Sequence, residues 1–113
     1  MAKLKRYCGN CILEIENGKY REYCGNVLYE LDGNKIRRYC GDNLYELDGN
    51  FIKEYCGNSL LEFDGRYLKR YCGNKIYELD GDKIKEYCGN TIYEIEGYLF
   101  RRELMGLLAI LFA

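Results

Sequence analysis

The sequence predicts a mainly β protein: a twelve-stranded antiparallel meander, closed into a barrel around a hydrophobic C-terminal helix. Three features predict it: six hairpin repeats of 16 residues, tight-turn pairs between short apolar runs, and an apolar tail. A fixed short period indicates units that bury their apolar faces only against their neighbours. Two residue types mark the period: Cys8, Cys24, Cys40, Cys56, Cys72 and Cys88, and Glu14, Glu30, Glu46, Glu62, Glu78 and Glu94.

The strands follow from the runs between the turn pairs. Residues 1–8 are half a unit, and full hairpin units follow up to a last run at 91–96. Gly-Asn, Gly-Asp and Asn-Gly pairs accept the positive φ values of tight hairpin turns, so the runs between them are predicted strands. We expect the first strand, 3–7, to pair with 91–96, which would leave no sheet edge exposed.

Alternation along the strands separates two faces. The outer face is expected to carry the repeated glutamates, each opposite a base in the simplest register. These bases are Arg21, Arg37, Lys53, Lys69 and Lys85. The inner face is expected to carry the cysteines together with Leu31, Leu47, Leu79, Ile36, Ile52, Ile84, Tyr29 and Tyr45.

One inward position alternates in charge, and this alternation supports closure. It reads Arg6, Glu22, Arg38, Glu54, Arg70, Glu86 along the chain. The signs can alternate around the whole circumference only if the barrel is closed and contains an even number of repeats. Closure also needs stagger between strands, which identical two-residue turns cannot supply. We therefore expect a longer or bulged turn at Cys-Gly-Asn, where Gly permits it. Without stagger, the alternative is a radial array or an open sheet of six hairpins.

The tail at 98–113 changes character and is predicted to be the helix. From Leu104 onward it is apolar all round, which for a helix indicates burial on every side. Those ten residues are too few to cross a bilayer, which takes about 17–25. Twelve strands enclose more space than side chains alone fill, and a helix about 10–12 Å across suits that space. We expect Gly106 where the helix passes closest to a strand. The chain is then a single domain, 1–113, with hairpin repeats at 1–97 and the helix at 98–113.

A twelve-stranded barrel with Tyr-Glu-Leu-Asp-Gly hairpins around a hydrophobic C-terminal helix resembles the tubby-like superfamily. That superfamily includes tubby C-terminal domains, phospholipid scramblases and LURP-one-related proteins. The resemblance covers the whole chain by layout and implies the fold, with a membrane-facing or binding role. The phosphoinositide-binding residues of tubby and the calcium site of scramblases match no positions in this chain.

Composition narrows the classes of function. Seventeen basic and eighteen acidic residues nearly cancel, which makes nucleic acid an unlikely partner. The chain has no His, the commonest general base and metal ligand, which disfavours an enzyme.

Successive cysteines would lie roughly 9–10 Å apart, too far for disulfides. The start, residues 1–6, has no apolar region typical of a signal peptide. We therefore expect reduced thiols and a cytoplasmic protein.

Two sets of residues are candidates for function. Cys8-Gly9-Asn10-Cys11 is the one C-x-x-C, which suits a redox pair or half a zinc site, although the repeat already accounts for Cys8. The six periodic cysteines are otherwise interpreted as small buried hydrophobes. The second set is a row of outward tyrosines beside Leu28, Leu44 and Ile76. It provides either a contact surface or cross-strand packing. The row comprises Tyr7, Tyr23, Tyr39, Tyr55, Tyr71 and Tyr87.

The favoured function is a non-enzymatic binding or scaffold module without a cofactor. It follows from the equivalence of the units and the absence of a singular polar cluster. One alternative is peripheral attachment to a lipid surface, with the tail leaving the barrel. The other is a thiol redox or metal-binding protein that uses Cys8 and Cys11. The ligand is not defined by the sequence, and a protein partner or a homo-oligomer is compatible with it.

Overall fold

The computed structural model describes residues 2–113, which form a single sheet and one helix. In each hairpin joined by a two-residue turn, the second strand is shorter than the first. The elements are β1 (Ala2–Arg6), β2 (Cys11–Glu16), β3 (Lys19–Glu22), β4 (Val27–Asp32), β5 (Lys35–Arg38), β6 (Asn43–Asp48), β7 (Phe51–Glu54), β8 (Ser59–Phe63), β9 (Tyr67–Arg70), β10 (Lys75–Asp80), β11 (Lys83–Glu86), β12 (Thr91–Glu96) and α1 (Arg101–Phe112).

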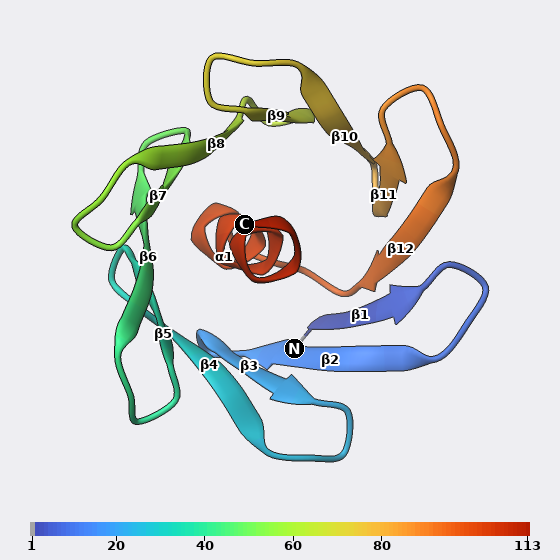
Figure 1. The fold of residues 1–113 in the computed structure, drawn as a ribbon. Coiled ribbons are helices and arrows are strands. Elements are labelled where there is room, and N and C mark those ends of the chain that lie inside the picture. Colours follow the sequence, from blue (N-terminus) through green and yellow to red (C-terminus); the bar gives the residue numbers. More distant parts are fainter. Residues whose placement is uncertain (1) are drawn as a thin grey trace.

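The sheet is a closed antiparallel barrel in which each strand pairs with its neighbours in sequence. Strand β1 pairs with β12 and joins the two ends, with Lys3 opposite Glu96 and Arg6 opposite Tyr93. Figure 1 looks along the barrel and shows α1, in red, inside the ring of strands. The predicted twelve-stranded barrel around a helix is confirmed, and the open-sheet alternative is wrong.

The stagger of the barrel comes from one bulge in every Cys-Gly-Asn hairpin. In the β3–β4 pair, Tyr20 lies opposite Tyr29 but Arg21 lies opposite Val27, so Leu28 has no partner. The same shift recurs in each pair joined by this kind of turn. Hairpins joined by two-residue turns have no shift, as in the β2–β3 pair. One irregular hairpin per repeat thus provides the strand offset that closure needs.

The Cys-Gly-Asn turn differs in detail from the prediction, because cysteine rather than glycine adopts the positive φ. In the turn at 38–41, Gly41 N–H donates to the Arg38 carbonyl (2.9 Å) and Cys40 has φ 57°. The third residue of such a turn is where Gly or Asn is usually required. The glycine that follows is needed for a different reason, because a side chain at its position would lie too close to a neighbouring residue. A Cβ on Gly25 would lie 2.9 Å from Glu22 Cβ.

We expect Cys40→Asn to raise the free energy of unfolding by about 1 kcal/mol, because Asn tolerates the left-handed region better than Cys. Urea denaturation of the two proteins measures the difference. The matched control is Cys11→Asn, since Cys11 begins strand β2, where Asn is unfavourable. That variant should lose stability. Equal losses at both positions would contradict this account of the turn.

The core lies between the inner face of the sheet and one helix. Met105, Leu107 and Leu108 are nearly or completely buried and pack against inward residues of the sheet such as Ile36 and Ile52. The helix begins at Arg101, later than the predicted 98, and residues 97–100 connect it to the sheet. Its last residues, Ile110 to Phe112, are half-buried because they reach one open end of the barrel. The predicted burial of the tail is confirmed for its middle.

Candidate functional site

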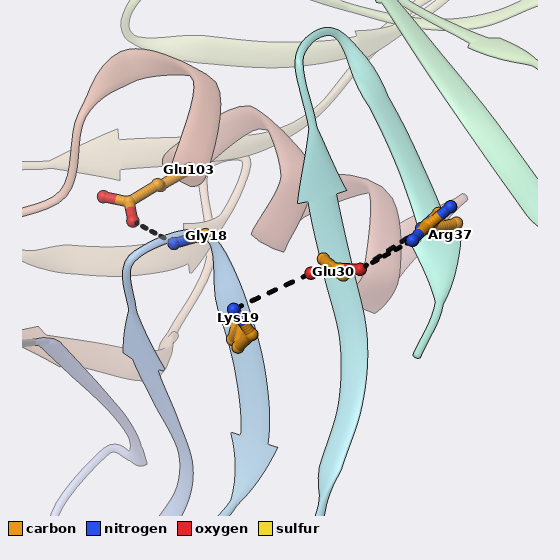
Figure 2. Close-up of polar contacts among 5 residues, drawn as sticks. All are labelled: Gly18, Lys19, Glu30, Arg37 and Glu103. Carbon is orange, nitrogen blue, oxygen red and sulfur yellow. Dashed lines mark hydrogen bonds and ion pairs between the residues drawn. The ribbon is translucent and has the colours of Figure 1, made fainter. Parts of the chain in front are cut away.

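The first turn of α1 is bound to the first hairpin by a buried glutamate. Glu103 is 7 % exposed, and its carboxylate accepts hydrogen bonds from the backbone N–H of Gly18 (3.1 Å) and of Phe100 (3.1 Å). Figure 2 shows its bond to Gly18. The carboxylate thereby satisfies one donor at the helix N-terminus, where negative charge is favourable, and one in the turn between β2 and β3. This contact positions the helix relative to the barrel.

A second contact fixes the helix from the side. The hydroxyl of Tyr20, which is fully buried, donates to the Glu103 carbonyl oxygen (2.7 Å). Burial, and to a smaller extent the neighbouring Glu103, raises the pKa of Tyr20 well above its usual value. Gly106 faces the same place, since a Cβ there would lie 2.6 Å from Ile36 Cδ1 and still closer to the Tyr20 hydroxyl. The helix therefore packs closely against β3 and β5, and the expectation for Gly106 agrees with its contacts.

The outer face carries cross-strand ion pairs, as the register prediction required. Glu30 lies opposite Arg37, and its carboxylate is 3.0 Å from the Arg37 guanidinium and 3.7 Å from Lys19 Nζ. Figure 2 shows this triplet across neighbouring strands. Further pairs join Glu14 to Arg21 and Glu62 to Lys69. Each exposed pair contributes little to stability, so this face is interpreted as a solvated surface.

The six outward tyrosines are exposed at equivalent positions, and we call them the tyrosine band. The exposed fraction lies between 42 % and 50 % for every one of them. Each backbone N–H donates to a carbonyl of the adjacent long strand in the barrel, for example Tyr39 to Leu28 at 3.0 Å. Two members make edge contacts with rings that lie two strands away: Tyr71 with Phe51 and Tyr87 with Tyr67. The band thus combines fixed positions with exposed rings.

The predicted apolar neighbours of the tyrosine band are placed differently. Ile12, Leu60, Ile76 and Ile92 pack against the core, and Ile76 lines a cavity together with Phe112. These residues occupy the bulge position, where an extra residue re-aims the side chains around it. Leu28 is the exposed exception, at 36 %. The expectation that such residues flank the tyrosines on the outer face is therefore wrong for Ile76, whereas Leu44 is half-buried and is not among the residues that pack on the core.

The alternating charges form a ring at the open end of the barrel beside the helix C-terminus, and we call it the mouth ring. Its members lie opposite inward residues, as Arg38 lies opposite Tyr29, and all six are exposed. Arg70 and Glu86 border a cavity of about 410 Å³ whose floor includes Phe112. Phe112 stacks on Tyr77 with ring centroids 3.9 Å apart. The mouth ring comprises Arg6, Glu22, Arg38, Glu54, Arg70 and Glu86.

The opposite end of the barrel has a second opening, beside the start of the helix. A cavity of about 500 Å³ is lined there by Asn17, Gly33, Phe100, Arg102 and neighbouring residues. Phe100 is 64 % exposed and contacts the ring of Tyr98, which is 75 % exposed. The carboxylate of Glu103 in this cavity is already bonded to backbone N–H groups. No unpartnered buried polar group of the described chain lies in this cavity.

The periodic cysteines are exposed, so their predicted place in the core is wrong. All six are free thiols in turns, beyond the end of the strand. Alternation between two faces applies only within a strand, and the strand ends two residues before each cysteine, as β5 does at Arg38. The sequence signal was the Gly that follows each cysteine, which marks a turn.

The C-x-x-C pair is divided between two environments. Cys8 is exposed in a turn, whereas Cys11 is half-buried in β2 with its thiol 3.5 Å from the Leu13 carbonyl oxygen. Burial raises the pKa of Cys11, which lowers the fraction of reactive thiolate. Within residues 2–113 no group of three His, Cys, Asp or Glu residues is placed to hold a metal ion. A redox or metal role for the pair stays a prediction.

Sequence reasoning missed two of the residues that hold the helix in place, Tyr20 and Glu103. A signal for one of them exists in the first full repeat. Tyr20 replaces the Ile or Leu found at this position in the other units, such as Ile36. The adjoining turn reads Asn17-Gly18 where the others begin with Gly. Departures from the repeat thus mark the place where the helix contacts the barrel.

The geometry defines the class of protein: a closed antiparallel barrel of hairpin repeats filled by its own C-terminal helix. The chain matches no protein-family model, no curated protein and no solved structure. In the part of the chain that the structure describes, the helix falls short of the length and apolar character that a membrane span requires.

Proposed function

We propose that the protein is a non-enzymatic binding module that contacts a protein or peptide partner through the tyrosine band. The observation that carries this proposal is the equal exposure of six tyrosines, 42–50 %, on a barrel whose other large apolar side chains are mostly buried. Tyrosine supplies a large amphipathic contact area at low conformational cost and is enriched at interfaces. Six equivalent positions also suit a partner with a repeated motif, because linked contacts add avidity.

The helix supports the scaffold part of this proposal. It fills the barrel and is bonded at its first turn by Glu103, so the band sits on a rigid frame. Little movement would then be needed on binding. The tubby-like resemblance remains a proposal that rests on the layout of strands and helix alone. The lipid alternative with a released tail is less favourable, because release would expose Met105, Leu107 and Leu108 to the interface or solvent.

Selection from a displayed random-peptide library tests the proposal. We expect enriched peptides to bind the wild-type protein and to bind a Tyr39→Ala, Tyr55→Ala, Tyr71→Ala variant at least about tenfold more weakly, since buried tyrosines dominate such interfaces. The matched control is Tyr98→Ala, because Tyr98 is exposed but lies outside the band.

Thermal melting must first show that the variants fold as the wild type does. Peptides whose affinity is the same for the wild type and the triple variant would contradict the proposal, as would a library that yields no binder. Flotation of both proteins with anionic vesicles distinguishes the lipid alternative. Equal flotation of the wild type and the triple variant, without peptide binding, would favour a lipid surface and not the tyrosine band.

A further inference from the structure

The six charges of the mouth ring are unsatisfied within the molecule. Among residues 2–113 no ion pair within 4 Å includes any of them. Neighbouring members lie two strands apart, roughly 9–10 Å between backbones. On the outer face, by contrast, three of the five predicted cross-strand Glu–base pairs form within 4 Å. The mouth ring therefore differs from an ordinary solvated face in leaving alternating charges free.

The alternation closes around the barrel. Pairing of β1 with β12 brings Arg6 next to Glu86 in the ring, so signs alternate at all six steps. The ring is thus self-complementary. A two-fold axis across the barrel, passing midway between an Arg and a Glu, places every Arg of one copy over a Glu of a second copy. This is the isologous arrangement by which most homodimers form. No ring of a single sign has this property.

The centre of the mouth contains a few half-buried apolar side chains within a mostly polar lining. Leu111 and Phe112 are only half-buried there, and Phe112 is the floor of the cavity that Arg70 and Glu86 border. The molecule measures 37 × 35 × 17 Å, with the short dimension along the barrel axis, and Figure 1 shows the broad end. The six ring members, roughly 9–10 Å apart, enclose a mouth roughly 18 Å across, so the contact is smaller than the area of about 800 Å² that each partner buries in a standard interface, and its specificity comes from the matched charges.

We propose that two copies of this chain associate face to face through the mouth ring. Six Arg–Glu pairs surround a centre formed by the C-terminal ends of both helices. The partner is a second copy because only a surface with the same sixfold alternation of sign matches all six charges at once. The tyrosine band stays outside this contact, so the dimer carries two bands side by side near its middle.

Analytical ultracentrifugation tests the dimer, with two triple variants of the mouth ring. The first has only glutamates in the ring (Arg6→Glu, Arg38→Glu, Arg70→Glu), and the second has only arginines (Glu22→Arg, Glu54→Arg, Glu86→Arg). We expect the wild type to dimerise and each variant alone to have a Kd at least about a hundredfold higher, because like charges then face each other. An equimolar mixture of the two variants should form a heterodimer with affinity restored.

Two further measurements separate a charge-matched contact from other causes. Raising the salt concentration from 0.1 M to 1 M shortens the screening length from about 10 Å to about 3 Å and should weaken the wild-type dimer. A control with the same change in net charge at the other end (Lys35→Glu, Arg101→Glu, Arg102→Glu) should still dimerise. Thermal melting checks that every variant is folded.

A wild type that stays monomeric from about 1 μM to about 1 mM would overturn the proposal. So would a dimer that persists in the all-glutamate variant, or folded variants that fail to form a heterodimer on mixing. The heterodimer result cannot come from a merely structural role of the ring, because each variant alone carries the same mutations. Full exchange of all six charges should leave self-association unchanged, since alternation is retained.

Discussion

Deletion of residues 104–113 is expected to leave a chain that does not fold. The deletion removes Met105, Leu107 and Leu108, which are at most 2 % exposed, and it uncovers inner-wall residues such as Ile36. Burial of each such side chain contributes about 1.5–3 kcal/mol, so the loss reaches the usual net stability of about 5–15 kcal/mol. The sheet has no other apolar element to cover its inner face.

A single substitution should have nearly the same effect. Leu108→Asp places an unpaired charge among apolar side chains, which costs far more than a lost contact. The matched control is Leu108→Met, which preserves volume and should cost less than about 1.5 kcal/mol. Circular dichroism, size-exclusion chromatography and urea denaturation report the outcome. A truncated protein that remains soluble, monomeric and cooperatively folded would show that the helix is not part of the core.

The barrel could be predicted because every local signal is repeated. One Gly-Asn pair is a weak turn signal, but its recurrence in successive units sets strand number and length together. The alternating charges of the mouth ring predict a closed barrel with an even number of repeats, and the pairing of β1 with β12 closes it. The need for stagger likewise predicted an irregular hairpin at Cys-Gly-Asn, and the register shift beside Leu28 and its equivalents supplies it.

The placement of the cysteines could not be derived from alternation. Whether a residue such as Cys40 belongs to the strand or to the turn depends on a φ of 57°, a value that sequence patterns assign to Gly or Asn. The bulge changes the direction of its neighbours as well, so Ile76 faces the mouth and not the tyrosines. Both errors arise at the irregular end of the hairpin, where period-two reasoning does not apply.

The contacts that attach the helix to the barrel could not be predicted from the sequence for a different reason. Contacts of a unique helix with a repeated barrel break the repeat's symmetry, and they show up only as departures from the consensus. Tyr20 is such a departure, and its hydroxyl binds the Glu103 carbonyl. Because the other units have Ile or Leu at this position, Tyr20 looks in the sequence like an ordinary substitution in the core. Its partner, Glu103, lies in a segment without repeats for comparison.

Gly106→Ala is expected to destabilise the protein although alanine is the better helix former. Alanine gains about 1 kcal/mol of helix propensity over glycine. Its methyl group, however, would lie 2.6 Å from Ile36 Cδ1 and closer still to the Tyr20 hydroxyl, which is held by its bond to the Glu103 carbonyl. Overpacking of this kind costs about 1–3 kcal/mol. We expect a net loss in urea denaturation, and a failure to fold for Gly106→Leu.

A double-mutant cycle identifies the cause of that loss. Tyr20→Phe removes the hydroxyl and Ile36→Val removes Cδ1, the two groups nearest to the added methyl. In that background Gly106→Ala should lose much less stability, because the two closest contacts are gone and only Tyr20 Cζ, at 3.2 Å from the added methyl, remains to offset the gain in helix propensity. Ile52→Val, which removes the same methyl from the corresponding buried position of β7, serves as the control and should not rescue. If rescue is equal with Ile52→Val, general loosening of the core explains the effect, and the close approach of α1 to β3 and β5 does not determine the choice of glycine.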